Sequence, residues 1–204
     1  DRGADAKIRD ATGWSALGIS ATSGYHLVVD LLLKHGVDPS SKSDDGKSVL
    51  MYAAKSGDVP TITTLIDNGA DMTARDRFGL TALMYAARED HADAVQAMLD
   101  KGAKVSDKDS SKWTALTWAV KKARVDAAKA LIAKGADVNV EDSEGTPLLQ
   151  HAVDTGSVEL VKLLLDHGAN VKAKDRYGLT ALVYAMKNQQ PDIVKLIKDA
   201  GGSY

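Results

Sequence analysis

Cysteine is absent from the 204 residues, and aromatic side chains make up only 5% of them. The lack of cysteine excludes disulfides, cysteine-ligated metals and a thiol nucleophile. No apolar run approaches the roughly 20 residues that span a bilayer, so membrane insertion is not expected. The net charge of −2 gives no whole-molecule reason to expect a nucleic-acid partner. Among compartments, a chain without thiols slightly favours export to a bacterial periplasm over the cytoplasm.

The sequence instead contains one unit that is repeated six times. A turn-like segment starts at Asp10 and returns every 33 residues, without insertion or deletion, as far as Asp175. The ends of the units agree as well, as in DNGADMTAR (67–75) and DHGANVKAK (166–174). A period of this length held along the chain is typical of a solenoid, in which each unit buries its apolar face against its neighbours.

The residues of the third unit predict two helices. Thr81 is expected to cap a helix that runs to Glu89, because its hydroxyl can accept a hydrogen bond from a free backbone N–H. A second helix is expected over 91–101, followed by Gly102 in the left-handed conformation. The side chains expected to face inward are Leu83, Ala86, Ala87, Val95, Met98 and Leu99. Alanine at the centre of each first helix lets neighbouring helices approach closely.

This pattern resembles the ankyrin-repeat family, whose unit is a β-turn finger followed by two antiparallel helices. The resemblance covers essentially the whole chain and implies an all-α repeat solenoid forming one domain. The segments expected are the tail of a preceding repeat at 1–9, repeats at 10–42, 43–75, 76–108, 109–141 and 142–174, and a C-terminal capping repeat at 175–204. Lys198, in place of a core aliphatic residue, fits such a cap. The start within a unit predicts further helices before Asp1 in a longer parent.

Departures from the family pattern are also present. The histidine of the family's Thr-Pro-Leu-His signature is replaced in every unit, so the hydrogen bonds that usually tie adjacent turns through it are expected to be missing. Lys112 stands where a turn glycine is expected, and Thr146-Pro147 lies one residue early. Such irregularity favours a natural protein over a consensus design.

No catalytic or metal-ligating pattern is found, so the chain is predicted to be neither an enzyme nor cofactor-dependent. The five histidines lack the spacing of a zinc site. Two of them, His35 and His167, stand just before a terminal glycine and are expected to cap helix C-termini. Carboxylates of the fingers, such as Asp44 and Asp45, are interpreted as solvated turn residues.

Aromatic side chains recur at two places in the unit. The tenth position reads Ile19, Tyr52, Tyr85, Trp118, His151 and Tyr184. These rings either pack between first helices or line the concave groove that the family uses, and the sequence leaves both open. Finger aromatics are clearer candidates for partner contact, because a turn buries a ring less easily; they are Trp14, Phe78, Trp113 and Tyr177.

Charge is unequally distributed between surfaces. At the family's variable contact positions stand 13 cationic residues and six acidic ones, so this face carries about +7 on a chain of −2. The cationic residues are Arg9, Lys42, Lys47, Lys55, Arg75, Arg77, Arg88, Lys108, Lys121, Lys122, Lys174, Arg176 and Lys187. The acidic ones are Asp44, Asp45, Glu89, Glu141, Glu144 and Asp154. A basic face predicts an acidic protein surface or loop as partner, unless it is only a solvated lysine-rich rim.

These observations predict a non-catalytic module, monomeric alone, that binds a partner protein in its groove. A sharper version is an inhibitor, or an immunity or self-protection protein, that covers a partner enzyme. The residues predicted to contact the partner are Trp14, Tyr52, Arg77, Phe78, Tyr85, Arg88, Trp113, Trp118, Lys121, Arg176, Tyr177 and Tyr184. Two alternatives remain: the regulatory ankyrin portion of a larger polypeptide, and nucleic-acid binding through the basic fingers, which the nearly neutral net charge disfavours.

Overall fold

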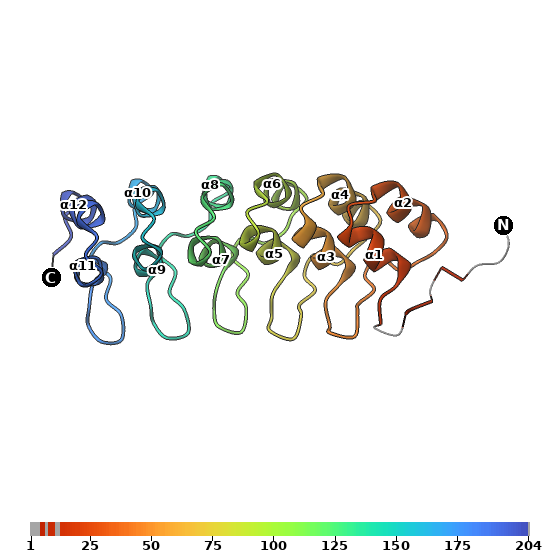
Figure 1. The fold of residues 1–204 in the computed structure, drawn as a ribbon, viewed down its shortest axis with the longest axis horizontal. Coiled ribbons are helices and arrows are strands. Elements are labelled where there is room, and N and C mark those ends of the chain that lie inside the picture. Colours follow the sequence, from red (N-terminus) through yellow and green to blue (C-terminus); the bar gives the residue numbers. More distant parts are fainter. Residues whose placement is uncertain (1–4, 7, 11–12, 204) are drawn as a thin grey trace.

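The structure is a computed structural model that describes residues 5–6, 8–10 and 13–203. It is an elongated stack in which two rows of helices lie above a row of finger loops (Figure 1). One row holds the first helix of each repeat and the other holds the second. The first helices are α1 (Ala16–Thr22), α3 (Val49–Ser56), α5 (Ala82–Arg88), α7 (Ala115–Lys121), α9 (Leu148–Thr155) and α11 (Ala181–Lys187). The second helices are α2 (His26–Lys34), α4 (Val59–Asp67), α6 (Ala92–Asp100), α8 (Val125–Ala133), α10 (Val158–Asp166) and α12 (Pro191–Asp199). Among the described residues, every helix is too short or too polar to cross a membrane.

The third repeat confirms the two predicted helices and corrects the role given to Thr81. Thr81 is the N-cap of α5, but its hydroxyl makes no capping hydrogen bond. The helix start is fixed instead by extended backbone at Thr81, whose carbonyl accepts from the N–H of Tyr85 at 3.3 Å. Gly102, after α6, has a φ of 97°, as its C′ position requires. Lys112, in place of a turn glycine, also adopts a positive φ, of 61°.

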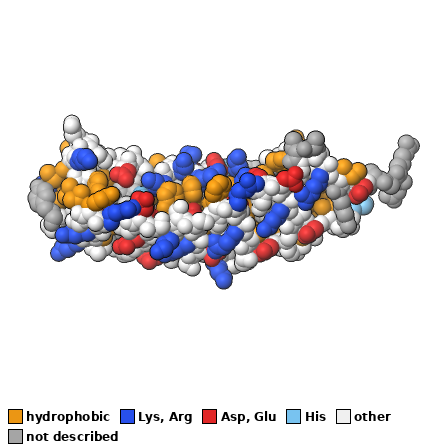
Figure 2. Space-filling model, turned by 90° about the horizontal axis from the view of Figure 1, so that it is seen from below, with side chains coloured by type: hydrophobic (Ala, Val, Ile, Leu, Met, Phe, Trp, Pro, Cys, Tyr) orange, Lys and Arg blue, Asp and Glu red, His pale blue; other side chains and the backbone are white. Residues whose placement is uncertain are grey.

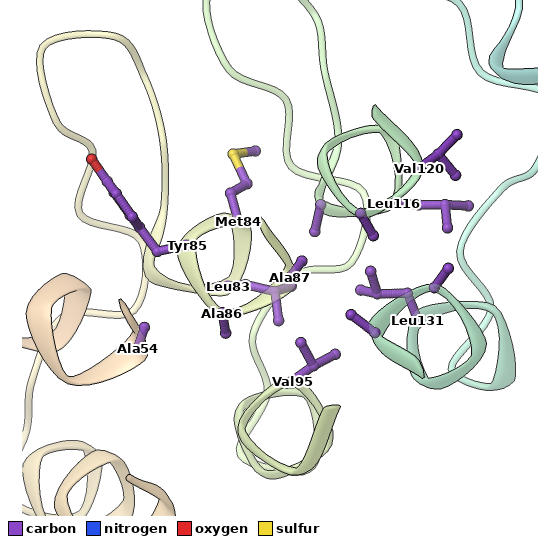
Figure 3. Close-up of a cluster of buried hydrophobic side chains, with 14 of the residues drawn as sticks. Ala54, Leu83, Met84, Tyr85, Ala86, Ala87, Val95, Leu116, Val120 and Leu131 are labelled. Carbon is purple, nitrogen blue, oxygen red and sulfur yellow. The ribbon is translucent and has the colours of Figure 1, made fainter. Parts of the chain in front are cut away.

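The core lies between the two rows of helices. Each first helix packs against its own second helix and against the first helices of neighbouring repeats. The central alanines of α3, α5, α7, α9 and α11 have no exposed surface; they are Ala53, Ala86, Ala119, Ala152 and Ala185. Figure 3 shows Leu83 and Val95 between α5 and α6, whereas Tyr85 leaves α5 on another side, toward a finger loop. The small side chains therefore set the close approach of neighbouring repeats.

The two ends of the stack differ. Val28 and Leu31 of α2 are exposed, whereas the residues equivalent to Val28 in the other repeats are buried by the preceding repeat; these are Thr61, Ala94, Ala127, Leu160 and Ile193. Tyr25 and Leu27 extend this exposed apolar surface, with 61% and 73% of their areas accessible. At the other end, Lys198 is exposed on α12.

In the third to sixth repeats, a carboxylate at the start of the finger joins the finger to the first helix of the same repeat. In the third repeat, Asp76 Oδ1 accepts from the backbone N–H groups of Phe78 and Leu80, both at 2.9 Å. Asp76 Oδ2 accepts from the hydroxyl of Tyr85 at 2.8 Å. One buried side chain thus fixes the turn through one oxygen and the helix through the other.

The same arrangement recurs in the three repeats that follow. We call Asp76, Asp109, Asp142 and Asp175 the finger carboxylates. In each, Oδ1 accepts from the N–H groups two and four residues ahead. Oδ2 lies within hydrogen-bond distance of the tenth-position side chain. The distances are 2.9 Å from Asp109 to Trp118 Nε1, 3.0 Å from Asp142 to His151 Nε2 and 2.6 Å from Asp175 to Tyr184 Oη. The main role of these tenth-position side chains is therefore to donate hydrogen bonds to the finger carboxylates.

The second repeat reaches the same result with a shifted carboxylate. Ser43 replaces the usual first aspartate, and Asp45 accepts from Ser43 Oγ, from Tyr52 Oη at 3.0 Å and from the Lys47 ammonium. Burial opposes ionisation of Asp45, but the hydrogen bonds from Lys47, Ser43 and Tyr52 outweigh it and hold its pKa far below the usual range. Asp45 is thus a partly exposed turn residue, as interpreted from the sequence, and it also accepts from Tyr52 of α3.

Replacing Tyr85 with Phe is expected to lower the free energy of unfolding by about 1.5–3 kcal/mol, because the buried carboxylate of Asp76 loses its hydroxyl donor. Urea unfolding followed by circular dichroism measures the change. Tyr177→Phe is the matched control: this tyrosine is 73% exposed, so the change is expected to stay within about 0.5 kcal/mol. Equal unfolding midpoints for the two variants would contradict a stabilising role of the Tyr85–Asp76 contact.

Candidate functional site

Two adjacent hollows lie between the fingers and the first helices. The central hollow, of about 520 Å³, is lined by Lys47, Lys55, Asp76, Phe78, Leu80, Tyr85, Arg88, Asp109, Ser110, Ser111, Trp113 and Trp118. The distal hollow, of about 460 Å³, is lined by Ser111, Trp113, Lys121, Asp142, Ser143, Glu144, Thr146, Gln150, His151, Asp154, Asp175, Arg176, Tyr177 and Tyr184. Because Ser111 and Trp113 belong to both linings, the hollows form one continuous groove. Figure 2, which looks onto the finger side, shows Lys and Arg side chains spread along it with apolar side chains among them.

Aromatic rings and one arginine form much of the wall of the central hollow. Trp113 and Trp118 lie edge to face, with ring centroids 4.8 Å apart. The guanidinium carbon of Arg88 is 5.0 Å from the Tyr85 ring centroid and 5.6 Å from that of Trp118. Arg88 also pairs with Glu89 at 3.2 Å. The two rings hold the guanidinium in place through cation–π attraction, so a fixed positive charge faces the hollow.

A buried histidine is the main feature of the distal hollow. Only 5% of His151 is exposed. Burial, aided by the nearby charge of Lys121, lowers the pKa of His151, and the carboxylate of Asp142 only partly offsets this. The imidazole is therefore neutral at pH 7. Since a carboxylate can only accept, Nε2 donates to Asp142, which leaves Nδ1 as an acceptor that has no partner among the described residues.

The sequence-predicted contact residues fall into three groups. In the central hollow the structure brings together Phe78, Tyr85, Arg88, Trp113 and Trp118. The distal hollow adds Lys121, Arg176, Tyr177 and Tyr184. Trp14 and Tyr52 lie apart from both, in contact with each other at a centroid distance of 4.5 Å, and Arg77 belongs to neither lining.

The fingers expose some of their aromatic rings and cover others. Phe78 is 67% exposed and Tyr177 is 73% exposed, as predicted for finger side chains. Trp14 and Trp113, two positions further along the finger, are half-buried. Tyr52 and Tyr85 are buried, so these rings are mainly core and hydrogen-bond donors; the groove interpretation applies to the half-buried Trp118 and Tyr184.

The two finger arginines are bound to neighbouring fingers. Arg77 donates to the carbonyl oxygens of Asp45 at 3.0 Å and Asp44 at 3.3 Å. Arg176 pairs with Glu144 at 2.6 Å. Their charges are thus partly used within the protein, and reversing either charge would also loosen the contact between adjacent fingers.

The role of the finger carboxylates in forming the site is not evident from the sequence, because aspartate is common in turns for reasons of turn chemistry alone. The available signal was a pairing of positions. Wherever the first position is Asp in repeats three to six, the tenth carries a hydrogen-bond donor, and in the second repeat a carboxylate two residues later takes its place.

The histidines that were expected to be structural are so. His35 and His167 are the C-caps of α2 and α10, and each ring Nδ1 lies 2.8 Å from a backbone carbonyl of its helix. Within the described ranges, no group of three or more His, Cys, Asp or Glu side chains is arranged to hold a metal ion.

Comparison with known proteins places the repeat in a family. A family model described as "Ankyrin repeats (3 copies)" matches residues 2–76, 50–142 and 135–203. The crystal structure of the ankyrin repeat domain of Bcl-3, a member of the IkappaB protein family, is similar to this chain with 27% identity and a TM-score of 0.85, covering 94% of this chain and 88% of that one. An ankyrin repeat domain from Acinetobacter baumannii AYE is similar with 26% identity and a TM-score of 0.83, covering 92% and 98%. Among curated proteins, no significant match is found.

The buried histidine predicts a pH effect on stability. Between about pH 7.5 and 5.5 the unfolded chain protonates His151 near its ordinary pKa of about 6.5, whereas the folded chain resists because its pKa is lowered. The unfolded state then binds more protons, so stability falls as the pH falls. His151→Gln keeps a donor for Asp142, and we expect its melting temperature to fall less than that of the wild type over this pH range. A His26→Gln variant, altered at an exposed ring, is the control; a wild-type to His151→Gln difference that does not change with pH would contradict the assignment.

Proposed function

The chain belongs to the ankyrin-repeat family, and from that premise we propose that it is a non-catalytic binding module that holds a partner protein against its fingers and first helices. Ankyrin-repeat domains in general mediate protein–protein interactions. The observation that carries the proposal here is the exposure of Phe78 and Tyr177 on fingers beside the two hollows. Exposed rings on an ordered support give large contact area at a small loss of conformational entropy.

The ordering of the fingers supports the same proposal. Each finger carboxylate holds its turn and its helix together, and neighbouring fingers are joined by backbone hydrogen bonds such as Ser110 N to Phe78 O at 3.1 Å and Ser143 N to Ser111 O at 2.9 Å. A surface that is already arranged before binding avoids much of the entropy cost of ordering it. The groove is therefore suited to rigid recognition of a folded surface or an extended loop.

The form of action we propose is steric. A partner enzyme whose surface is covered by this groove would be inhibited or neutralised, which is the role of an immunity or self-protection protein. The basic residues that face the central hollow, notably Lys55 and Arg88, favour a partner that presents carboxylates there. We also propose export to a bacterial periplasm, on the strength of the missing cysteine and of the similarity to a bacterial ankyrin repeat domain.

Affinity capture from the native extract, with the chain immobilised, tests the proposal. A Phe78→Ala/Tyr177→Ala double variant is expected to capture at least about tenfold less partner than the wild type, because exposed aromatic anchors often contribute more than 1 kcal/mol each. Tyr25→Ala, which removes a tyrosine of similar exposure far from the groove, is the matched control and is expected to capture normally. Circular dichroism confirms that the variants fold.

Two results would contradict the groove as the binding surface. In the first, the double variant captures as much partner as wild type while Tyr25→Ala loses it, which would move the interface to the end of the stack. In the second, the captured material is nucleic acid whose retention falls steeply with salt, as expected for binding to basic fingers through phosphates.

A further inference from the structure

We propose that the groove binds groups of opposite charge on its partner. The central hollow binds an apolar side chain with a neighbouring carboxylate, and the distal hollow binds a cationic side chain. This proposal rests on the proposed function, because it states which partner segments the groove accepts. It starts from a difference between the linings of two hollows that meet at one side chain, Trp113.

The charge that the central hollow offers to a ligand is positive. Two carboxylates line it, Asp76 and Asp109, and each already accepts from two backbone N–H groups and one aromatic donor. Three cationic side chains line it as well, and the ammonium of Lys55 forms no ion pair with any described residue. The carboxylates are thus used within the fold, and Lys47 and Arg88 are paired with Asp45 and Glu89, so Lys55 is the lining cation that remains available to an anion.

Apolar surface accompanies this positive charge. Phe78 and Leu80 of one finger, with Trp113 and Trp118 across the hollow, form apolar walls. A flat ring or branched aliphatic side chain fits between such walls, and a carboxylate attached to it lies within reach of the cationic side chains. The chemistry that matches is therefore an anionic, aromatic or aliphatic group.

The lining of the distal hollow is formally acidic. Two cationic side chains line it, and one of these, Arg176, is already paired with Glu144. Four carboxylates line it, and three of these are used within the fold: Asp142 and Asp175 as finger carboxylates, and Glu144 in its pair with Arg176. Asp154 is exposed and forms no ion pair with any described residue. Two of the six acidic residues of the contact face, Glu144 and Asp154, come from the fifth repeat, and Glu141 directly precedes it.

Unsatisfied acceptors point to a donor-rich ligand. His151 Nδ1 and Gln150 Oε1 are buried and have no hydrogen-bond partner among the described residues, although both side chains line the distal hollow. Buried acceptors without donors are unfavourable, so a ligand with N–H groups gains by approaching them. Tyr177 and Tyr184 add ring faces that attract a cation. An ammonium or guanidinium group meets all three requirements.

Two probes with the same ring and opposite charge test the proposal: indole-3-propionate, an anion, and tryptamine, a cation. The chain has three tryptophans, so its indole N–H groups give three resolvable NMR signals. Trp118 lines the central hollow only, Trp113 lines both, and Trp14 lines neither. We expect indole-3-propionate to shift the Trp118 and Trp113 signals, tryptamine to shift Trp113 but not Trp118, and neither to shift Trp14.

Matched charge changes separate the two hollows. Lys55→Glu is expected to weaken indole-3-propionate about fivefold and to leave tryptamine unchanged. Asp154→Asn is expected to weaken tryptamine about threefold and to leave indole-3-propionate unchanged. Lys195→Glu, an equivalent reversal on exposed α12 surface, controls for the change in net charge and is expected to alter neither affinity by more than about 1.5-fold.

The proposal is overturned if both probes prefer the same hollow, if tryptamine shifts Trp118 more than Trp113, or if neither probe binds up to its solubility limit. Preference of both hollows for indole-3-propionate would also overturn the proposal, and it would indicate a partner that is acidic along its whole length. Failure here is distinguishable from failure of the proposed function: partner capture that depends on Phe78 and Tyr177 would stand without any charge discrimination, and discrimination would stand if capture did not depend on them.

Discussion

A carboxylate in each of the second to sixth repeats makes the finger side of this protein a defined surface. In the third to sixth repeats its two oxygens bind different elements: Oδ1 accepts from two N–H groups of the turn, and Oδ2 accepts from a side chain on the first helix. The alanine-lined core stacks the helices and includes Leu80 at the end of the third finger. The carboxylate adds to the contacts between neighbouring fingers in fixing the loops that carry Phe78 and Tyr177. With these contacts, the fingers keep their orientation relative to the groove.

Most of the fold could be predicted from sequence because its determinants are local and repeated. The 33-residue period, the glycine after each second helix and the central alanines each act over one turn or one neighbouring repeat. Helix ends were therefore predicted to within one residue, as for α5 and α6. The exception at Thr81 is a matter of side-chain geometry: extended backbone starts the helix whether or not the hydroxyl turns toward an N–H, and sequence does not encode that rotation.

The site was harder to predict because exposure depends on the adjacent repeat. Phe78 and Trp113 are both finger aromatics, yet Phe78 points outward while Trp113 packs against Trp118 and lies 6.0 Å from His151 of the next repeat. Tyr85 has the helical phase of a groove residue, but its hydroxyl is drawn to Asp76 and its ring is buried. Position in the unit narrows the choice, and only the packed neighbour decides which ring a partner can reach.

Photo-cross-linking tests most directly whether this finger groove is the surface that binds. A benzoylphenylalanine placed at Phe78 or at Tyr177 substitutes one exposed ring for another, and one placed at Ala133, exposed at the end of α8, reports on the row of second helices. Irradiated with the captured partner, the chains carrying the group at positions 78 and 177 are expected to form a covalent adduct, and the chain carrying it at 133 is not. An adduct from position 133 with none from 78 or 177 would show that the partner binds the outer helices and would contradict the groove.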